Sequence, residues 1–123
     1  MKDLLSQQVR QFSDTTDIAI GGKKFDQDKP RIELVSPIAL VELSKVLTFG
    51  AKKYDANNWR KGIAWSRLIG ATMRHVNSYN SGETYDKETG LSHAAHAMCE
   101  LMFLLEFEKT HPELDDRFKI GSK

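Results

Sequence analysis

Two histidines and a glutamate form the pattern most suggestive of chemistry. His93, His96 and Glu100 follow one another at intervals of three and four residues. Residues at this spacing share one face of an α-helix, so their side chains project together. Imidazole and carboxylate groups one turn apart can bind a single divalent cation. The alternative is that both histidines hydrogen-bond to carboxylates of neighbouring helices. The spacing alone does not favour one interpretation over the other.

Carboxylates upstream of this pattern could complete a metal site. Glu83 and Asp86 are three residues apart in a loop just before His93, and their oxygens suit Mg²⁺ or Mn²⁺. Glu42 lies on the edge of an apolar helical stripe, from which it can reach the mouth of a helical bundle. We therefore predict Mg²⁺ or Mn²⁺ bound by Asp86, His93 and three residues that also act in catalysis: Glu42, Glu83 and His96. In the alternative interpretation the loop carboxylates and Glu42 are solvated.

Positive and aromatic side chains could hold a phosphorylated ligand beside such a metal. Cations near an acidic metal site bind phosphate oxygens, and an indole can stack on a base, although a tryptophan beside a short loop is more often part of a core. The predicted phosphate and nucleotide contacts are Lys29, Arg31, Lys52, Lys53, Asn58, Trp59, Arg60 and Arg74. Considered one at a time, most of these side chains are of the kind commonly found exposed to solvent on a protein surface. Their combination with the metal ligands predicts a pocket for a metal-bound nucleotide.

Three apolar stripes with helical spacing must position these residues. The first helix begins at Ser36-Pro37 and reaches about Gly50, with a possible extension to Tyr54. The second runs from about Trp65 until Asn80-Ser81-Gly82, and the third from His93 to about Thr110. No convincing alternating strand pattern occurs. We therefore predict an all-α fold, a small helical bundle with an irregular N-terminal arm over residues 1–28 and a single helical catalytic domain over 29–123.

Composition narrows the class of protein. The 123 residues are 40% hydrophobic and 28% charged with a net charge of +1, which is typical of one globular domain and gives no general attraction to nucleic acid or membranes. The first twenty residues carry no apolar signal segment and no run is long enough to span a bilayer, so we expect a cytoplasmic protein. Three helices bury only a modest core, which favours a homodimer or homotetramer.

Several linked motifs resemble a known family. In order along the chain they are Phe25-Asp26-x-Asp28-Lys29-Pro30-Arg31, Thr48-Phe49-Gly50-Ala51-Lys52-Lys53-Tyr54, Asn58-Trp59-Arg60-Lys61-Gly62, Arg74-His75, Gly82-Glu83-x-x-Asp86 and Gly90-x-x-His93-x-x-His96. This order resembles the phage dATP/dGTP diphosphohydrolases of the MazZ type over about residues 24–107. The resemblance implies a MazG-like all-α fold and hydrolysis of purine deoxynucleoside triphosphates, dGTP and dATP, to the monophosphate and pyrophosphate. It also implies a phage role, the supply of dGMP for DNA that contains 2-aminoadenine, with the host-cell cytoplasm as the location.

One departure from the family pattern keeps other functions open. MazG-type enzymes place Glu-x-x-Glu on one helix and Glu-x-x-Asp on a later one, whereas this chain has Glu42 alone and then His93-x-x-His96. A histidine-metal phosphohydrolase with different products is therefore one alternative, although the chain contains no His-Asp dipeptide. A non-catalytic nucleotide-binding or interaction module is another.

Overall fold

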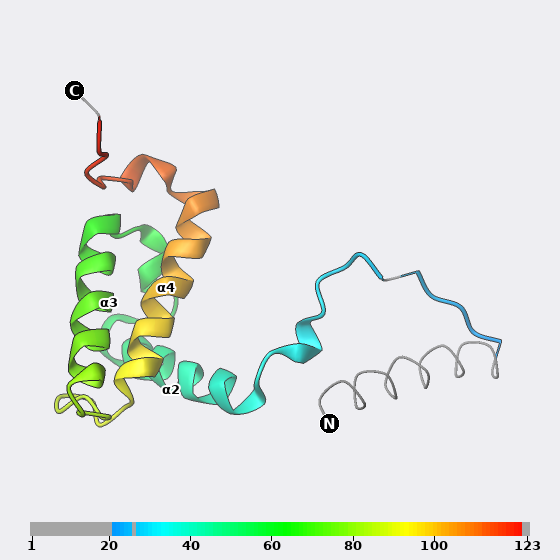
Figure 1. Ribbon diagram of the computed structural model, residues 1–123, viewed down its shortest axis with the longest axis horizontal. Coiled ribbons are helices and arrows are strands. Elements are labelled where there is room, and N and C mark those ends of the chain that lie inside the picture. The colour runs from blue at the N-terminus through cyan, green and yellow to red at the C-terminus, as the bar shows by residue number, and fades with distance from the viewer. Residues whose placement is uncertain (1–20, 26, 122–123) are drawn as a thin grey trace. The chain divides into compact units, whose positions relative to one another are not determined.

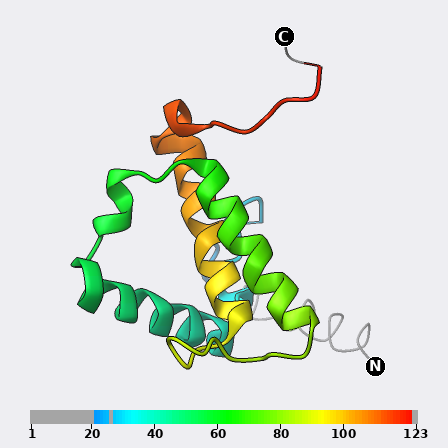
Figure 2. The ribbon, with the colours of Figure 1, turned by 90° about the vertical axis from the view of Figure 1, so that its left-hand side faces the viewer.

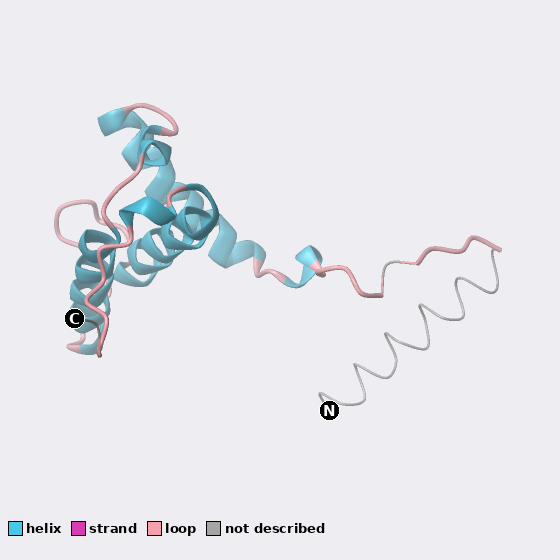
Figure 3. Ribbon diagram, turned by 90° about the horizontal axis from the view of Figure 1, so that it is seen from above, coloured by secondary structure: helices cyan, strands magenta, loops and turns pink. Residues whose placement is uncertain are grey.

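The described part of the protein is built from helices. The computed structural model describes residues 21–25 and 27–121, so most of the predicted N-terminal arm lies outside the described residues. Within them no β-strand occurs, apart from an isolated bridge between Tyr85 and Ser92 (Figure 3). The elements are η1 (Ile32–Leu34), α2 (Pro37–Tyr54), η2 (Asn58–Lys61), α3 (Trp65–Asn80), α4 (His93–Thr110) and η3 (Pro112–Leu114), the three long helices being labelled in Figure 1. The predicted all-α fold is thus confirmed.

The three α-helices belong to one structural unit. The chain divides into two units, and all three helices lie in the one that starts at Glu33. Figure 2 shows α3 and α4 side by side, with α2 crossing near the end where α3 stops and α4 starts. None of the described helices is long and apolar enough to cross a membrane.

Local capping explains where α2 and α4 begin. The side-chain oxygen of Ser36 accepts a hydrogen bond from the Ala39 backbone N–H at 3.1 Å, and Pro37 occupies the first helical position. Ser92 caps α4 in the same way, through the Ala94 N–H at 3.1 Å. Both starts agree with the sequence because serine at these positions satisfies an N–H group that has no partner within the helix.

The N-terminus of α3 depends on a distant residue instead. Its N-cap position is Ala64, whose side chain cannot accept a hydrogen bond. Asp116 takes over this role, because its two carboxylate oxygens accept from the Ser66 backbone N–H at 2.8 Å and from the Ser66 hydroxyl at 2.6 Å. The C-terminal segment therefore stabilises the start of α3 from about fifty positions away in the sequence, which no local pattern could indicate.

Helix α4 contributes to both apolar clusters of the core. Val46, Ala95 and Cys99 form one cluster, between α2 and α4. Trp65, Leu68 and Phe107 form the other, between α3 and α4, and Phe103 packs against both. Because α4 is the element common to both clusters, its packing fixes how the other two helices are placed.

Replacing the most buried side chain tests this arrangement. Phe107 is fully buried at 0% exposure, so we expect Phe107→Ala to lower the free energy of unfolding by about 3–5 kcal/mol through the cavity it leaves. Urea unfolding followed by circular dichroism measures this. Phe118→Ala is the matched control, because Phe118 is 88% exposed and should change stability by less than about 0.5 kcal/mol. Equal effects of the two variants would contradict the core described above.

His111 links the end of α4 to η2. Its Nε2 lies 2.9 Å from the Arg60 backbone carbonyl, and its Nδ1 lies 2.8 Å from Glu113 Oε2. Both neighbours are acceptors, so both ring nitrogens donate when the imidazole is protonated. The hydrogen bond to Glu113, followed by that to the Arg60 carbonyl, raises the pKa of His111. The η2 segment is thereby held against the C-terminal end of α4.

This link predicts a pH-dependent contribution to stability. Because the pKa of His111 is raised in the folded protein, its contribution is complete below the unfolded value of about 6.5 and is lost as the pH rises through the folded value. We expect the Tm advantage of the wild type over His111→Gln to shrink between acidic and alkaline pH. Thermal unfolding of both proteins across this range measures it, and other titrating groups cancel in the difference. A pH-independent difference would contradict the assignment.

Candidate functional site

Three elements meet in a cluster of possible metal ligands. His75 lies in the second half of α3, Asp86 in the loop that follows, and His93 is the first residue of α4. Because α3 and α4 lie side by side and are joined by this loop (Figure 2), the end of one helix is next to the start of the other. One ligand atom from each of the three residues lies within 4.8 Å of the other two.

The two histidine rings face each other at close range. His75 Nδ1 and His93 Nδ1 are 2.8 Å apart. On their outer edges, His93 Nε2 lies 2.7 Å from Glu83 Oε1 and His75 Nε2 lies 3.4 Å from Glu100 Oε1. If each Nε2–H donates to its carboxylate, both Nδ1 lone pairs point inward, and a proton or a cation must separate them.

The spacing of the two nitrogens suits a shared ion. Two nitrogens bound at right angles to a metal at about 2.0–2.1 Å would lie about 2.9 Å apart, close to the 2.8 Å between His75 and His93. Carboxylates that hydrogen-bond the outer nitrogens of metal-bound histidines are a common device for orienting the rings. The cluster therefore fits a metal ion held by His75, Asp86 and His93, with Glu83 and Glu100 orienting the imidazoles.

Asp86 is held as an ionised carboxylate. Its Oδ1 accepts hydrogen bonds from the backbone N–H groups of Glu88 and Thr89, each at 2.9 Å. Burial opposes ionisation, but these two donors keep the pKa of Asp86 below its usual range. Both bonds go to one oxygen, so they leave the second oxygen available to a cation.

The surroundings of His75 and His96 favour the neutral imidazole. Burial lowers the pKa of His75, and the neighbouring His96 and His93 lower it further, against an opposing effect of Asp86. Burial also lowers the pKa of His96. Neutral imidazole is the form that binds metals, so these environments favour binding near neutral pH.

His96 borders the cluster without being one of its three central members. Its ring stacks on that of His75 at a centroid distance of 4.6 Å and an angle of 6°. Its Nε2 lies 2.7 Å from the Thr89 hydroxyl, in the same loop that carries Asp86. His96 therefore fixes the orientation of His75 from the side and connects the cluster to the loop.

A pocket of about 920 Å³ lies against the cluster. Residues of α2, η2 and α4 line it, together with Arg67 of α3, and His96 and Glu100 belong to its wall. Glu100 Oε2 is buried and has no hydrogen-bond partner among the described residues. Burial, against the opposing charge of Arg74, raises the pKa of Glu100 to about 7. Since Glu100 also faces His75, it connects the pocket to the cluster.

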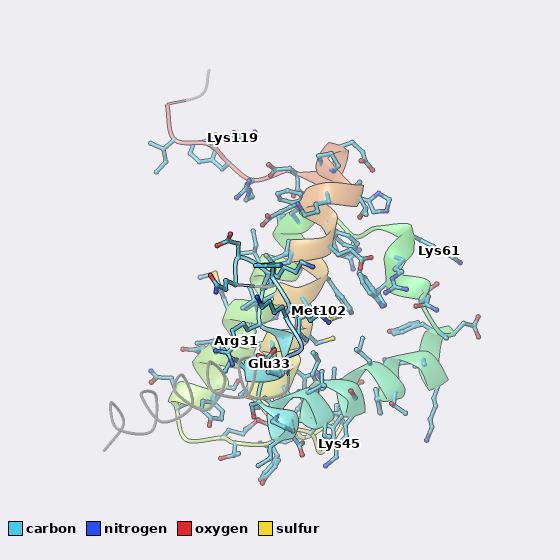
Figure 4. All side chains as sticks on the ribbon, turned by 90° about the vertical axis from the view of Figure 1, so that its right-hand side faces the viewer. Arg31, Glu33, Lys45, Lys61, Met102 and Lys119 are labelled. Carbon is cyan, nitrogen blue, oxygen red and sulfur yellow. The ribbon has the colours of Figure 1, made fainter. Side chains whose placement is uncertain are left out.

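The structure brings together part of the predicted metal set. Asp86 and His93 lie in the cluster of possible ligands, and Glu83 and His96 adjoin it. Glu42 instead has its carboxylate 2.9 Å from Lys45 Nζ, and Figure 4 shows Lys45 on the side of α2 turned away from α4. The assignment of Glu42 as a ligand and catalytic residue stays a prediction without a contact that supports it.

Two functional candidates were missing from the sequence-based assignment. His75 was expected only as part of the Arg74-His75 motif, and Glu100 shared a helical face with His93 and His96 but was not among the predicted ligands. His75 is eighteen residues from His93, so only the pairing of α3 with α4 makes them neighbours. His75 and Glu100 are likewise on different helices, 25 residues apart, so no helical periodicity links them.

Among the predicted nucleotide contacts, Asn58, Trp59 and Arg60 line the pocket. Phe103 stacks on the Trp59 ring at 4.3 Å, and the Arg60 guanidinium lies 4.8 Å from its centroid. The indole is therefore packed by protein groups, as a core anchor is. Arg60 itself lies 3.2 Å from Glu106 Oε2.

The remaining predicted cations are not part of the pocket wall. Lys53 lies 3.6 Å from Glu88 Oε1, and Lys52 and Arg74 are exposed outside the lining. Lys29 and Arg31 belong to the unit that precedes Glu33. Arg67, which was not among the predicted contacts, also lines the pocket. Figure 4 shows Lys61, at the end of η2, pointing away from the other helices.

The fold and the cluster together define a class, an all-α protein with a histidine and carboxylate site beside a pocket. A family model described as "dATP/dGTP diphosphohydrolase, N-terminal" matches residues 20–117. The chain therefore belongs to this family. It is 42% identical over 96 residues to a protein of Salmonella phage PMBT28 named dATP/dGTP diphosphohydrolase, which covers 78% of this chain and 33% of that protein. The chain thus spans about a third of the length of this curated relative, and no solved structure matches it.

The cluster predicts measurable metal binding. We expect His93→Ala to weaken Mn²⁺ binding at least about 100-fold and Glu83→Gln about 10–100-fold, because the first removes a ligand and the second only its orienting partner. Isothermal titration calorimetry with the metal-free chain measures both. His111→Gln is the control, since it changes a histidine outside the cluster and should bind Mn²⁺ as the wild type does. Equal binding by all four proteins would contradict the site.

Proposed function

We propose that this chain catalyses metal-dependent hydrolysis of dATP and dGTP to the deoxynucleoside monophosphate and pyrophosphate. The observation that carries the proposal is the convergence of His75, Asp86 and His93 beside a pocket of about 920 Å³. Pockets of roughly 300–1,000 Å³ are typical of small-molecule sites. Membership of the family and the name of the Salmonella phage relative supply the substrate class.

His75, Asp86 and His93 would hold the metal, with Glu83 and Glu100 orienting the two imidazoles. Of the two predicted ions, the mixed nitrogen and oxygen ligands favour Mn²⁺ over Mg²⁺, which prefers oxygen alone. When bound, such an ion polarises a phosphoryl oxygen and lowers the pKa of a coordinated water. The sequence-based set included His96 as a ligand, and its place in the pocket wall makes contact with substrate the better-supported role.

The pocket wall supplies the remaining contacts. His96 and Glu100 are the ionisable side chains of α4 that line the pocket, so a phosphate bound there would lie against them. Arg60 and Arg67 also line the pocket, where their positive charge would attract the triphosphate. The amide of Asn58 offers both a donor and an acceptor to a base. Trp59 would shape this wall rather than stack on the base, because Phe103 and Arg60 already cover its ring.

The biological setting follows from the family resemblance. Hydrolysis of dGTP would supply dGMP as the precursor of 2-aminoadenine in phage DNA, and hydrolysis of dATP would remove the competing nucleotide. Both substrates are small, diffusible molecules of the cytoplasm of a host cell, which is where we place the reaction. The MazG-like character of the fold is part of the same proposal.

Product identification tests the reaction. The purified chain is incubated with each deoxynucleoside triphosphate in the presence of Mn²⁺, Mg²⁺ or a chelator, and the products are separated by ion-exchange chromatography. We expect dGMP or dAMP with pyrophosphate, no product with chelator, and a loss of at least about 100-fold in kcat/KM for His93→Ala, since metal ligands are essential to such catalysis. Lys109→Ala, an exposed change on the same helix, should retain activity.

Other products distinguish the alternatives. Inorganic phosphate or tripolyphosphate would contradict cleavage between the α and β phosphates and support a different metal phosphohydrolase. Nucleotide binding without turnover under every metal condition would overturn the enzymatic proposal for this chain and support a binding module.

A further inference from the structure

Helix α4 has a second apolar face, opposite the one that carries the histidines. Ala94, Met98, Leu101 and Leu105 follow one another at intervals of four, three and four residues, which places them in one stripe along the helix. The only polar side chains between Ala94 and Leu105 are His96 and Glu100, and both line the pocket described above. A helix that is apolar on every other side is expected to be covered on those sides.

This stripe forms one side of an apolar groove of about 530 Å³. Leu43 of α2, Val76 and Tyr79 of α3, and Ala97 and Met102 of α4 complete its lining. The larger side chains are well exposed: Leu105 is 64%, Val76 is 54%, Tyr79 is 50% and Leu101 is 49% accessible. Contiguous apolar surface of this kind on a small protein usually marks an interaction site.

We propose that a second copy of this chain covers the groove, with its α4 antiparallel to the first across a twofold axis. The stripe begins with a small side chain, Ala94, and ends with a large one, Leu105. A twofold axis midway between residues 99 and 100 sets Ala94 against the partner's Leu105 and Met98 against the partner's Leu101. A large side chain thus meets a small one at both ends, so the surface is complementary to itself, as a twofold dimer requires.

The area is large enough for a stable pair. Half-exposed side chains as large as Leu101, Leu105, Val76 and Tyr79 each present on the order of 100 Å², and with Met98 and Ala94 the groove presents roughly 600 Å² per copy. Two copies would then bury on the order of 1,200 Å², the lower end of the range for specific protein interfaces. A dimer is therefore the smallest assembly that covers this face. Of the homodimer and homotetramer predicted from the sequence, both can contain this pair.

The dimer would also support the metal cluster. His93, His96 and Glu100 lie on α4, whose other face would be packed by the partner. Covering both faces reduces the freedom of this helix, and each copy keeps its own complete cluster because His75, Asp86 and His93 come from one chain. The proposal does not rest on the reaction, since an inactive chain could dimerise in the same way.

A charge placed in the groove tests the interface. Sedimentation velocity and light scattering should give twice the chain mass for the wild type and a monomer for Leu101→Glu. Phe118→Glu is the matched control, because it places the same charge on an exposed aromatic residue outside the groove and should leave the dimer intact. Circular dichroism checks that all three proteins are folded. A monomeric wild type, or a dimeric Leu101→Glu, would overturn the proposal, and the groove would then belong to another partner.

Cross-linking tests the antiparallel register independently of that variant. Ala94→Cys and Leu105→Cys proteins are mixed, allowed to exchange subunits and treated with a short bismaleimide. The antiparallel pair predicts a covalent heterodimer on mixing and little product from either variant alone, because identical positions lie about 16 Å apart along the helix axis. The native Cys99 is 3% exposed, so the wild type should give no product. Cross-linking of each single variant with itself, and not in the mixture, would contradict the register.

Discussion

The 2.8 Å approach of His75 Nδ1 to His93 Nδ1 is the contact on which the candidate site depends. When the outer nitrogens carry the protons, two neutral imidazoles cannot hold their Nδ1 lone pairs this close without a proton or a cation between them. Glu83 and Asp86 bring carboxylates to the pair, and Glu100, whose pKa burial raises to about 7, faces His75. This combination favours a cation at the centre, and it explains why ionisable groups are found in a partly buried position.

That contact exists only because α3 and α4 pack side by side. Phe107 and Leu68 hold the two helices together at one end, and the loop that carries Asp86 joins them at the other. Helix α4 contributes residues to the core, the cluster and the pocket, so a change in its packing would alter the geometry of all three. In the dimer proposed above, the apolar outer face of α4 packs against a second copy of the chain. A helix with so few polar residues is expected to be covered on more than one side.

The region shared with the Salmonella phage relative contains the whole cluster. The family match covers residues 20–117, and His75, Asp86 and His93 all lie inside it. The relative is about three times longer than the matched segment, and the three possible ligands of the cluster all come from this segment. Tests of metal binding on the isolated chain therefore address the site directly, apart from any contribution that other parts of longer relatives make.

The sequence by itself determined the helices, because serine caps, proline at a first position and apolar periodicity act over a few residues. It also indicated Asp86, His93 and the neighbouring Glu83 and His96, which lie within fourteen residues of one another. The tertiary structure decided what a local pattern cannot: that Asp116 caps α3, that His75 joins the cluster, and that Trp59 is packed rather than free. It also placed Glu42 beside Lys45. Spacing along one helix fixes which residues share a face, whereas contacts between helices depend on how their side chains interlock, and that packing is set by the whole chain.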